Sequence, residues 1–260
     1  MLLQFDYDMK LTYSEPIHRC HFTIKCIPKD TCRQKLLGKE IMLTPPVVYS
    51  SGTDSYGNAT IYGHVADAHD LFEFHIKGEV EIFPCEYEEV ANMSRIGMYK
   101  YPSGKCIAGE RLLQYFQSLK LDCIGSEYDK CLYIMHKLYQ DFAYVSASTQ
   151  VETDAETAFA QGTGVCQDYA HIYITLLRLS GIAARYVCGL LVGEGASHAW
   201  VEALIGDKWV GFDPTNDCLV RNSHIKIGDG RDATECAINR GIMWGNCNQN
   251  QEITAMVVQK

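Results

Sequence analysis

One cysteine of this chain stands where a thiol could act as a nucleophile. Cys166 follows a glycine-rich turn at residues 162–165, and the segment from 166 to 179 favours a helix that Ser180-Gly181 closes. A free thiol has a pKa of about 8.5, and the unpaired N–H groups at the start of a helix favour the reactive thiolate. The same groups would bind the oxyanion of a tetrahedral intermediate. Packing is the usual role of a cysteine, but this setting predicts acyl-transfer chemistry at Cys166.

Two residues that would assist a nucleophile lie on a predicted β-hairpin. If residues 206–207 form a two-residue turn, the register places Trp200 opposite Asp213. His198 is then a diagonal neighbour of Asp213, about 7–8 Å away at the backbone and within reach of its side chain. A three-residue loop would turn one strand over and separate the two side chains.

The three residues together predict a Cys–His–Asp triad. His198 would take the proton of Cys166 and later protonate the leaving group, while Asp213 would fix the tautomer of the imidazole. Taken alone, His198 has a simpler interpretation as a core histidine. Asp213 before Pro214 has one as the start of an Asx turn. Their order on a helix and two strands favours the triad.

Three further residues lie near this site, and for two of them the sequence leaves alternatives open. Gln161 lies five residues before Cys166, where it could donate to the oxyanion or be a solvated loop residue. Trp200 could wall a substrate channel or belong to the core. Asp168 falls in the first helical turn, where an acid complements the helix dipole.

The composition excludes several classes of partner. The formal net charge of −9 repels nucleic acid and anionic membrane surfaces. The N-terminus is acidic by Asp6 and has no apolar h-region, and no stretch approaches the about 18 apolar residues of a membrane helix. We therefore expect a cytoplasmic protein that binds a peptide or protein substrate, and no nucleic acid or membrane. The oligomeric state stays open.

The twelve cysteines favour free thiols over a disulfide framework, although the sequence does not decide whether any disulfide forms. Many of them sit in apolar patterns of a long chain, and no Cys-x-x-Cys occurs. His18, Cys20, His21 and Cys26 are close in sequence, but strand alternation sends His21 to the opposite face. We expect no metal site and no cofactor.

Hydrophobic periodicity predicts an α+β protein. Apolar residues alternate with polar ones over 72–82 and 20–26, which indicates an antiparallel β-sandwich in the first third of the chain. Helical patterns follow at 110–119, 126–142 and, with a capping box at 153–156, up to about residue 160. Strands are expected at 185–192, 197–204 and 208–213. The predicted domains are a sandwich (1–90), a linker with helices of the core (91–149) and a catalytic core (150–260).

Four segments resemble the bacterial transglutaminase-like family. They are GVCQDYA (164–170), GIAARYV (181–187), SHAWVE (197–202) and WVGFDPTN (209–216). The front of the chain, with Asp54–Asn58, is similar to the β-sandwich that precedes the core in those proteins. The tail, with 230–232 and 240–242, resembles the end of the family. The likeness is greater to bacterial proteins described as cysteine proteases than to animal crosslinking enzymes.

The resemblance implies a papain-like α+β core that bears the Cys166, His198 and Asp213 triad. It implies acyl transfer through a thioester, with hydrolysis of a peptide or amide bond as the leading hypothesis. An amine-accepting transglutaminase is the alternative; it would need water exclusion and an amine tunnel, and the sequence shows neither. A non-catalytic binding or scaffold protein with a relict site is the third.

Overall fold

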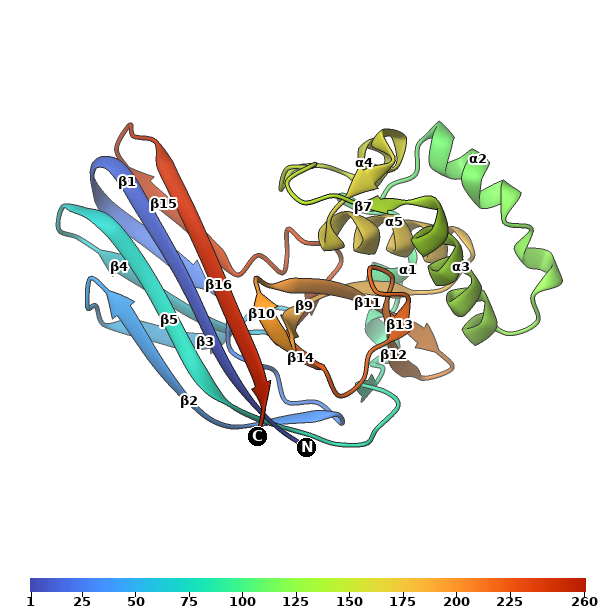
Figure 1. The fold of residues 1–260 in the computed structure, drawn as a ribbon, viewed down its shortest axis with the longest axis horizontal. Coiled ribbons are helices and arrows are strands. Elements are labelled where there is room, and N and C mark those ends of the chain that lie inside the picture. The colour runs from blue at the N-terminus through green and yellow to red at the C-terminus, as the bar shows by residue number, and fades with distance from the viewer.

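The computed structural model describes residues 1–260 and shows an antiparallel β-sandwich packed against an α+β core (Figure 1). The core carries its helices on the side away from the sandwich in this view. Both ends of the chain lie together at the lower edge of the sandwich. No helix is long and apolar enough to cross a bilayer.

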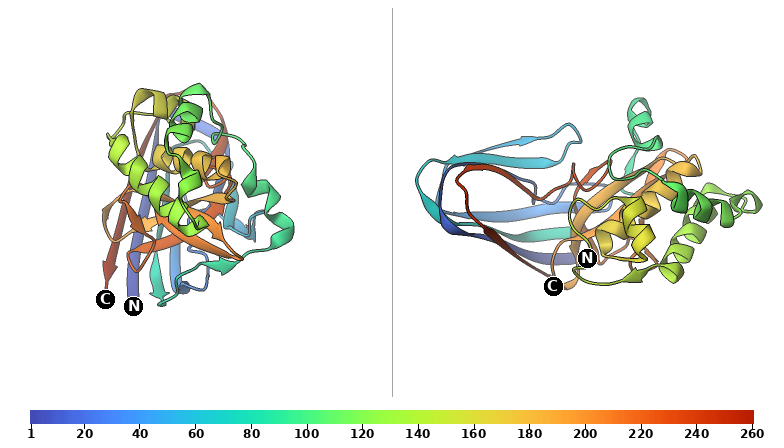
Figure 2. Two further views of the ribbon diagram at one scale, coloured as in Figure 1. Left: turned by 90° about the vertical axis from the view of Figure 1, so that its right-hand side faces the viewer. Right: turned by 90° about the horizontal axis from the view of Figure 1, so that it is seen from above.

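The sandwich is organised around one long strand, β1 (Leu2–Ile24). Its first half alternates buried and exposed residues and pairs with β5 (His69–Ile82) and β16 (Gln249–Gln259). Its second half pairs with β4 (Ala59–Val65) and β15 (Asn239–Trp244). β1 therefore runs from one layer into the other, and Figure 2 shows both layers from above. Two further strands, β2 (Gln34–Thr44) and β3 (Tyr49–Thr53), pair with β5 and β4 respectively.

The last two strands of the chain lie in the sandwich, which differs from the predicted domain boundary. The prediction places residues 239–260 in the core, but β15 and β16 pair with β1 of the sandwich. Ala255 and Val257 are buried while Met256 and Val258 are exposed, which is the alternation of a half-buried strand. The physical reason is that β1 would otherwise present an unpaired edge, which β16 covers.

The core sheet contains six antiparallel strands in the order β13-β12-β11-β9-β14, with β6 beside β12. The bounds of these strands are β6 (Glu89–Val90), β9 (Ala184–Leu191), β11 (His198–Ile205), β12 (Lys208–Asp213), β13 (Cys218–Leu219) and β14 (His224–Gly230). Ile205 pairs with Lys208 and Val201 with Phe212. The two-residue turn and the register on which the predicted site depends are therefore confirmed. A short strand, β10 (Gly193–Gly195), pairs with β16 and links core to sandwich.

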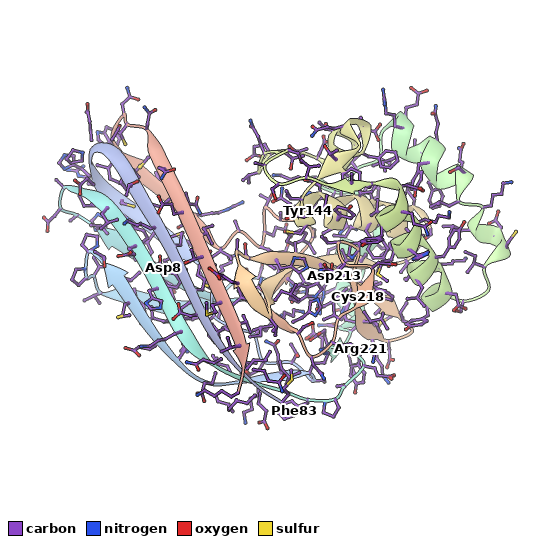
Figure 3. The ribbon with its side chains drawn as sticks, viewed as in Figure 1. Asp8, Phe83, Tyr144, Asp213, Cys218 and Arg221 are labelled. Carbon is purple, nitrogen blue, oxygen red and sulfur yellow. The ribbon has the colours of Figure 1, made fainter.

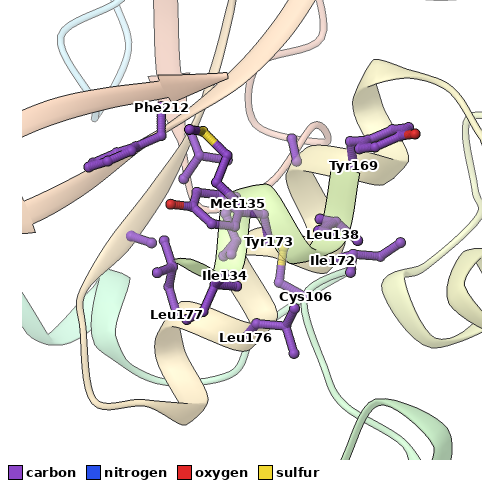
Figure 4. Close-up of a cluster of buried hydrophobic side chains, with 14 of the residues drawn as sticks. Cys106, Ile134, Met135, Leu138, Tyr169, Ile172, Tyr173, Leu176, Leu177 and Phe212 are labelled. Atoms are coloured by element: carbon purple, nitrogen blue, oxygen red, sulfur yellow. The ribbon is translucent and has the colours of Figure 1, made fainter. Parts of the chain in front are cut away.

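The helices pack around one buried helix, α5 (Cys166–Leu179). The other helices are α1 (Gly97–Lys100), α2 (Glu110–Ser118), α3 (Glu127–Asp141) and α4 (Ala155–Gln161). Two short strands, β7 (Ala143–Tyr144) and β8 (Thr163–Gly164), pair with each other. Short 3₁₀ turns cover 93–95 and 121–123. Figure 4 shows α5 contributing Tyr169, Ile172 and Tyr173 to a cluster with α3 and the sheet. This packing holds the start of α5 in a fixed position.

The capping interactions of these helices agree only in part with the sequence. Ser126 caps α3 as predicted, accepting from the N–H of Asp129. At α4 the cap is Asp154, whose carboxylate accepts from the N–H of Thr157 at 2.8 Å, and not Thr153. Glu156, the expected partner in a capping box, instead accepts three backbone N–H groups at the start of α2. Tertiary contact has replaced the local motif there.

A buried ionic network joins the two units. Glu202 accepts from Arg185 at 2.6 Å and from Lys226 at 2.8 Å, and all three side chains are buried. Lys226 also lies 3.0 Å from Asp229. Asn58 of the sandwich donates to the backbone oxygen of Asp229 at 2.8 Å. Asn58 thus docks the sandwich against the core sheet.

Candidate active site

Cys166 is the first residue of α5, where a helix leaves its backbone N–H groups without internal partners. The turn before it is held by Asp168, whose Oδ2 accepts from the N–H of Val165 at 2.8 Å and from the hydroxyl of Thr149 at 2.6 Å. Burial raises the pKa of Asp168, an effect that these two hydrogen bonds oppose. Asp168 therefore shapes the turn that presents Cys166, in addition to its place near the helix dipole.

His198 and Asp213 meet where their strands end. His198 begins β11 and Asp213 ends β12, and the imidazole Nε2 lies 2.8 Å from the carboxylate Oδ2. Burial by itself would lower the pKa of His198. Hydrogen bonds to Asp213 and to Cys166, with their negative charges, outweigh burial and raise this pKa to about 10. The structure thus places His198 against Asp213, with Cys166 close enough to raise the pKa of His198.

The Asp213 carboxylate is fully buried and surrounded by donors. Oδ2 accepts from His198, from Nδ2 of Asn216 at 2.8 Å and from Nε2 of His224 at 3.1 Å. Oδ1 accepts from the N–H groups of Thr215 and Asn216 at 3.0 and 3.2 Å. Burial would raise the pKa of Asp213, but these donors and the charge of His198 hold it well below its usual range. The Asx turn and the contact with His198 are both present.

His224 is the site residue that sequence reasoning missed. It begins β14, is buried, and reaches the same oxygen of Asp213 as His198 does. In the sheet order, β14 pairs with β9 and not with the hairpin, so no local register rule links His224 to Asp213. The ligand atoms of His198, Asp213 and His224 lie within 4.8 Å of one another, a set that could also hold a transition-metal ion. The hydrogen bonds to Asp213 account for the same geometry.

Gln161 and Trp200 lie near the site in other roles. The Gln161 amide nitrogen donates to the Ser148 carbonyl at 2.9 Å and to the Thr163 hydroxyl at 3.1 Å, so its donors hold the loop before α5. Trp200 is fully buried in a small cluster with Val187 and Val220. Its ring packs against the imidazoles as a core residue, so it does not wall a channel.

The fold agrees with the comparisons with known proteins. Residues 120–214 match the transglutaminase-like superfamily, and residues 3–81 match the bacterial transglutaminase-like N-terminal region. The chain belongs to the bacterial transglutaminase-like family.

Its relatives match it over most of its length or over part of it. An uncharacterised protein of Mycobacterium tuberculosis is 27% identical over 262 residues, which cover 88% of this chain and 83% of that protein. One from Mycobacterium leprae is 42% identical over 112 residues, covering 39% of this chain and 40% of its own. The crystal structure of a protein from Cytophaga hutchinsonii, named "putative cysteine protease", superposes with a TM-score of 0.79 at 24% identity. That match covers 100% of this chain and 92% of the other, and shows a shared α+β fold.

Proposed function

We propose that the protein is a cysteine hydrolase that cleaves a peptide or amide bond by acyl transfer through Cys166, His198 and Asp213. The observation that carries the proposal is the 2.8 Å contact of His198 with Asp213, beside a Cys166 thiol that raises the pKa of His198. The name of the Cytophaga neighbour supports the same class of reaction. The helix N-terminus at Cys166 supplies the oxyanion donors that such a reaction needs.

The first half-reaction transfers the acyl group to sulfur. The Cys166 thiolate, formed when His198 holds the thiol proton, attacks the carbonyl carbon and the new C–S bond moves the π electrons onto oxygen. N–H groups of the first turn of α5 bind that oxyanion. The imidazolium of His198 then gives its proton to the departing amine, the C–N bond breaks, and an acyl-thioenzyme remains.

The second half-reaction returns the enzyme. His198, now neutral, takes a proton from water as the water oxygen attacks the thioester, and the C–S bond breaks to release a carboxylic acid. Asp213 positions His198 in both halves and stays ionised. An amine in place of water would give transamidation by the same steps, so the acceptor is the property to measure.

Selective labelling tests the nucleophile. Cys166 is expected to react with a limiting amount of iodoacetamide at neutral pH before the other cysteines, which the structure shows as free thiols. Cys218 is the matched internal control, because it pairs with Asp213 in the β12–β13 ladder and lies beside it in Figure 3. Burial and the charges of Asp213 and Asp217 raise the pKa of Cys218 to about 11, so it should label slowly. Equal slow labelling of all twelve thiols would refute the proposal.

Product analysis tests the reaction. The protein and its Cys166→Ala variant would be incubated with a peptide library and, separately, with a glutamine peptide plus a fluorescent amine. We expect new peptide termini or released ammonia without amine incorporation, and loss of both in Cys166→Ala but not in Cys218→Ala. Amine incorporation that depends on Cys166 would instead assign a transglutaminase.

A further inference from the structure

A second imidazole shares the carboxylate of the proposed triad. His224 Nε2 lies 3.1 Å from Asp213 Oδ2, the atom that His198 also contacts. The rings of His198 and His224 are 6.2 Å apart, and the edge of His224 meets Trp200 with a centroid distance of 5.2 Å. The steps proposed above for catalysis use only one of these two imidazoles.

The hydrogen bonds of His224 define its tautomer. An ionised carboxylate can only accept, so Nε2 of His224 must donate to Asp213. Nδ1 of His224 lies 3.1 Å from the hydroxyl of Ser223, which can donate to it. The neutral ring with hydrogen on Nε2 satisfies both contacts at once.

The surroundings of His224 favour the uncharged ring. Burial lowers its pKa, and the positive charges of His198 and Arg33 lower it further, while Asp213 acts in the opposite direction. His198 differs, because its contacts with Asp213 and Cys166 raise its pKa. Two imidazoles therefore share one carboxylate, and only His198 takes the charge.

We infer that His224 is a positioning residue that, as a neutral donor oriented by Ser223, locks the Asp213 carboxylate in the orientation that holds His198 against Cys166. The inference rests on the proposed function. Oδ2 is fixed from two sides by His198 and His224, so the carboxylate cannot rotate without breaking a buried hydrogen bond. His224 touches no reacting atom, and its effect passes through Asp213.

A matched pair of variants tests this role. His224→Gln keeps an N–H donor at about the reach of Nε2, whereas His224→Met has a similar length without a donor. The rate of Cys166 alkylation by iodoacetamide would be measured at pH 7, together with an NMR titration of ¹³C-labelled histidine. Loss of a hydrogen bond to a charged group should change the alkylation rate by about tenfold or more. We expect His224→Met to be at least about tenfold slower and His224→Gln to keep most of the rate.

The direction of the His198 titration separates positioning from simple charge competition. If His224 positions Asp213, the pH midpoint of His198 falls in His224→Met because its ion pair is loosened. If His224 only shares the carboxylate charge, removing its imidazole strengthens the ion pair of His198 with Asp213. The pH midpoint of His198 then rises, which would overturn the inference. Equal alkylation rates in the Gln and Met variants, with equal melting temperatures, would do the same.

Two further measurements keep the outcomes distinct. If His224→Met does not fold, Ser223→Ala serves instead: it removes the donor to Nδ1, and an unchanged alkylation rate and His198 midpoint would contradict the role of the tautomer. If Cys166 of the unmodified protein labels no faster than its other thiols, the proposed function fails. Fast Cys166 labelling in every His224 variant would leave that function standing and reject the role of His224 alone.

Discussion

The Asp213→Asn variant tests the electrostatics of the site. The amide has the shape of the carboxylate, and its oxygen can still accept from the N–H groups of Thr215 and Asn216 as Oδ1 does. The amide nitrogen then takes the place of Oδ2, so the negative charge 2.8 Å from His198 is lost together with the acceptor for His198, His224 and Asn216. Without that charge, the pKa of His198 is expected to fall from about 10 to its ordinary range or below, since burial also lowers it.

The size of the effect follows from these values. The pKa of an ordinary imidazole is 6.5, and that of His198 is about 10. At about 1.4 kcal/mol per pH unit, this difference in pKa favours the imidazolium by about 5 kcal/mol. A hydrogen bond to a charged group contributes about 1.5–3 kcal/mol. Losing the imidazolium beside the sulfur should therefore slow alkylation of Cys166 at pH 7 by at least about tenfold, a cost that lies within the available energy.

Alkylation from pH 5 to 9, quantified at Cys166 by mass spectrometry, measures this prediction. The unmodified protein should react at least about tenfold faster than Asp213→Asn at pH 7. Asp217→Asn is the matched control, because it removes the carboxylate 2.6 Å from the exposed His136 on the surface. Superimposable profiles for Asp213→Asn and the unmodified protein would refute the reasoning.

Three further predictions concern stability. The pKa of His198 is higher in the folded than in the unfolded protein, so its contribution to the free energy of unfolding is complete below about pH 6.5 and is lost as the pH rises toward 10. Urea unfolding should show a loss of a few kcal/mol over this range, and His198→Ala should not show it. Glu202→Gln removes a buried carboxylate that both Arg185 and Lys226 contact and should cost about 3–5 kcal/mol in chemical denaturation, and a cost below about 1 kcal/mol would contradict the network. Gly189→Ala would place a Cβ 2.2 Å from Trp200 and should lower the melting temperature sharply, while Gly125→Ala, which meets nothing within 4 Å, should not.

The parts of the site that are local in sequence were predictable from it. The two-residue turn fixes the register that brings His198 and Asp213 together, and the pair Gly206-Asp207 between two expected strands indicated it. Cys166 was marked by the glycine turn before a helix. The geometry of each feature depends on a few neighbouring residues, so local rules apply.

The missed features depend on contacts between distant segments. His224 reaches Asp213 only because β14 crosses to the far side of β9. Glu156 leaves its local capping box because the start of α2 lies within its reach. Trp200 shares a face of β11 with His198, but whether that face is open or covered at Trp200 depends on Val220, 20 residues later. No periodicity within one segment contains that information.

The pairing of β1 with β16 sets the order in which the chain can fold during synthesis. β1 is synthesised before the core, yet one of its two partners over Leu3–Tyr13, besides β5, is formed by residues 249–259, and the N–H of Lys260 donates to the carbonyl of Leu2 at 3.1 Å. The segment that carries Cys166, His198 and Asp213 emerges between β1 and β16. The core sheet can therefore assemble before β16 is synthesised, whereas the sandwich is completed only after β16 has emerged.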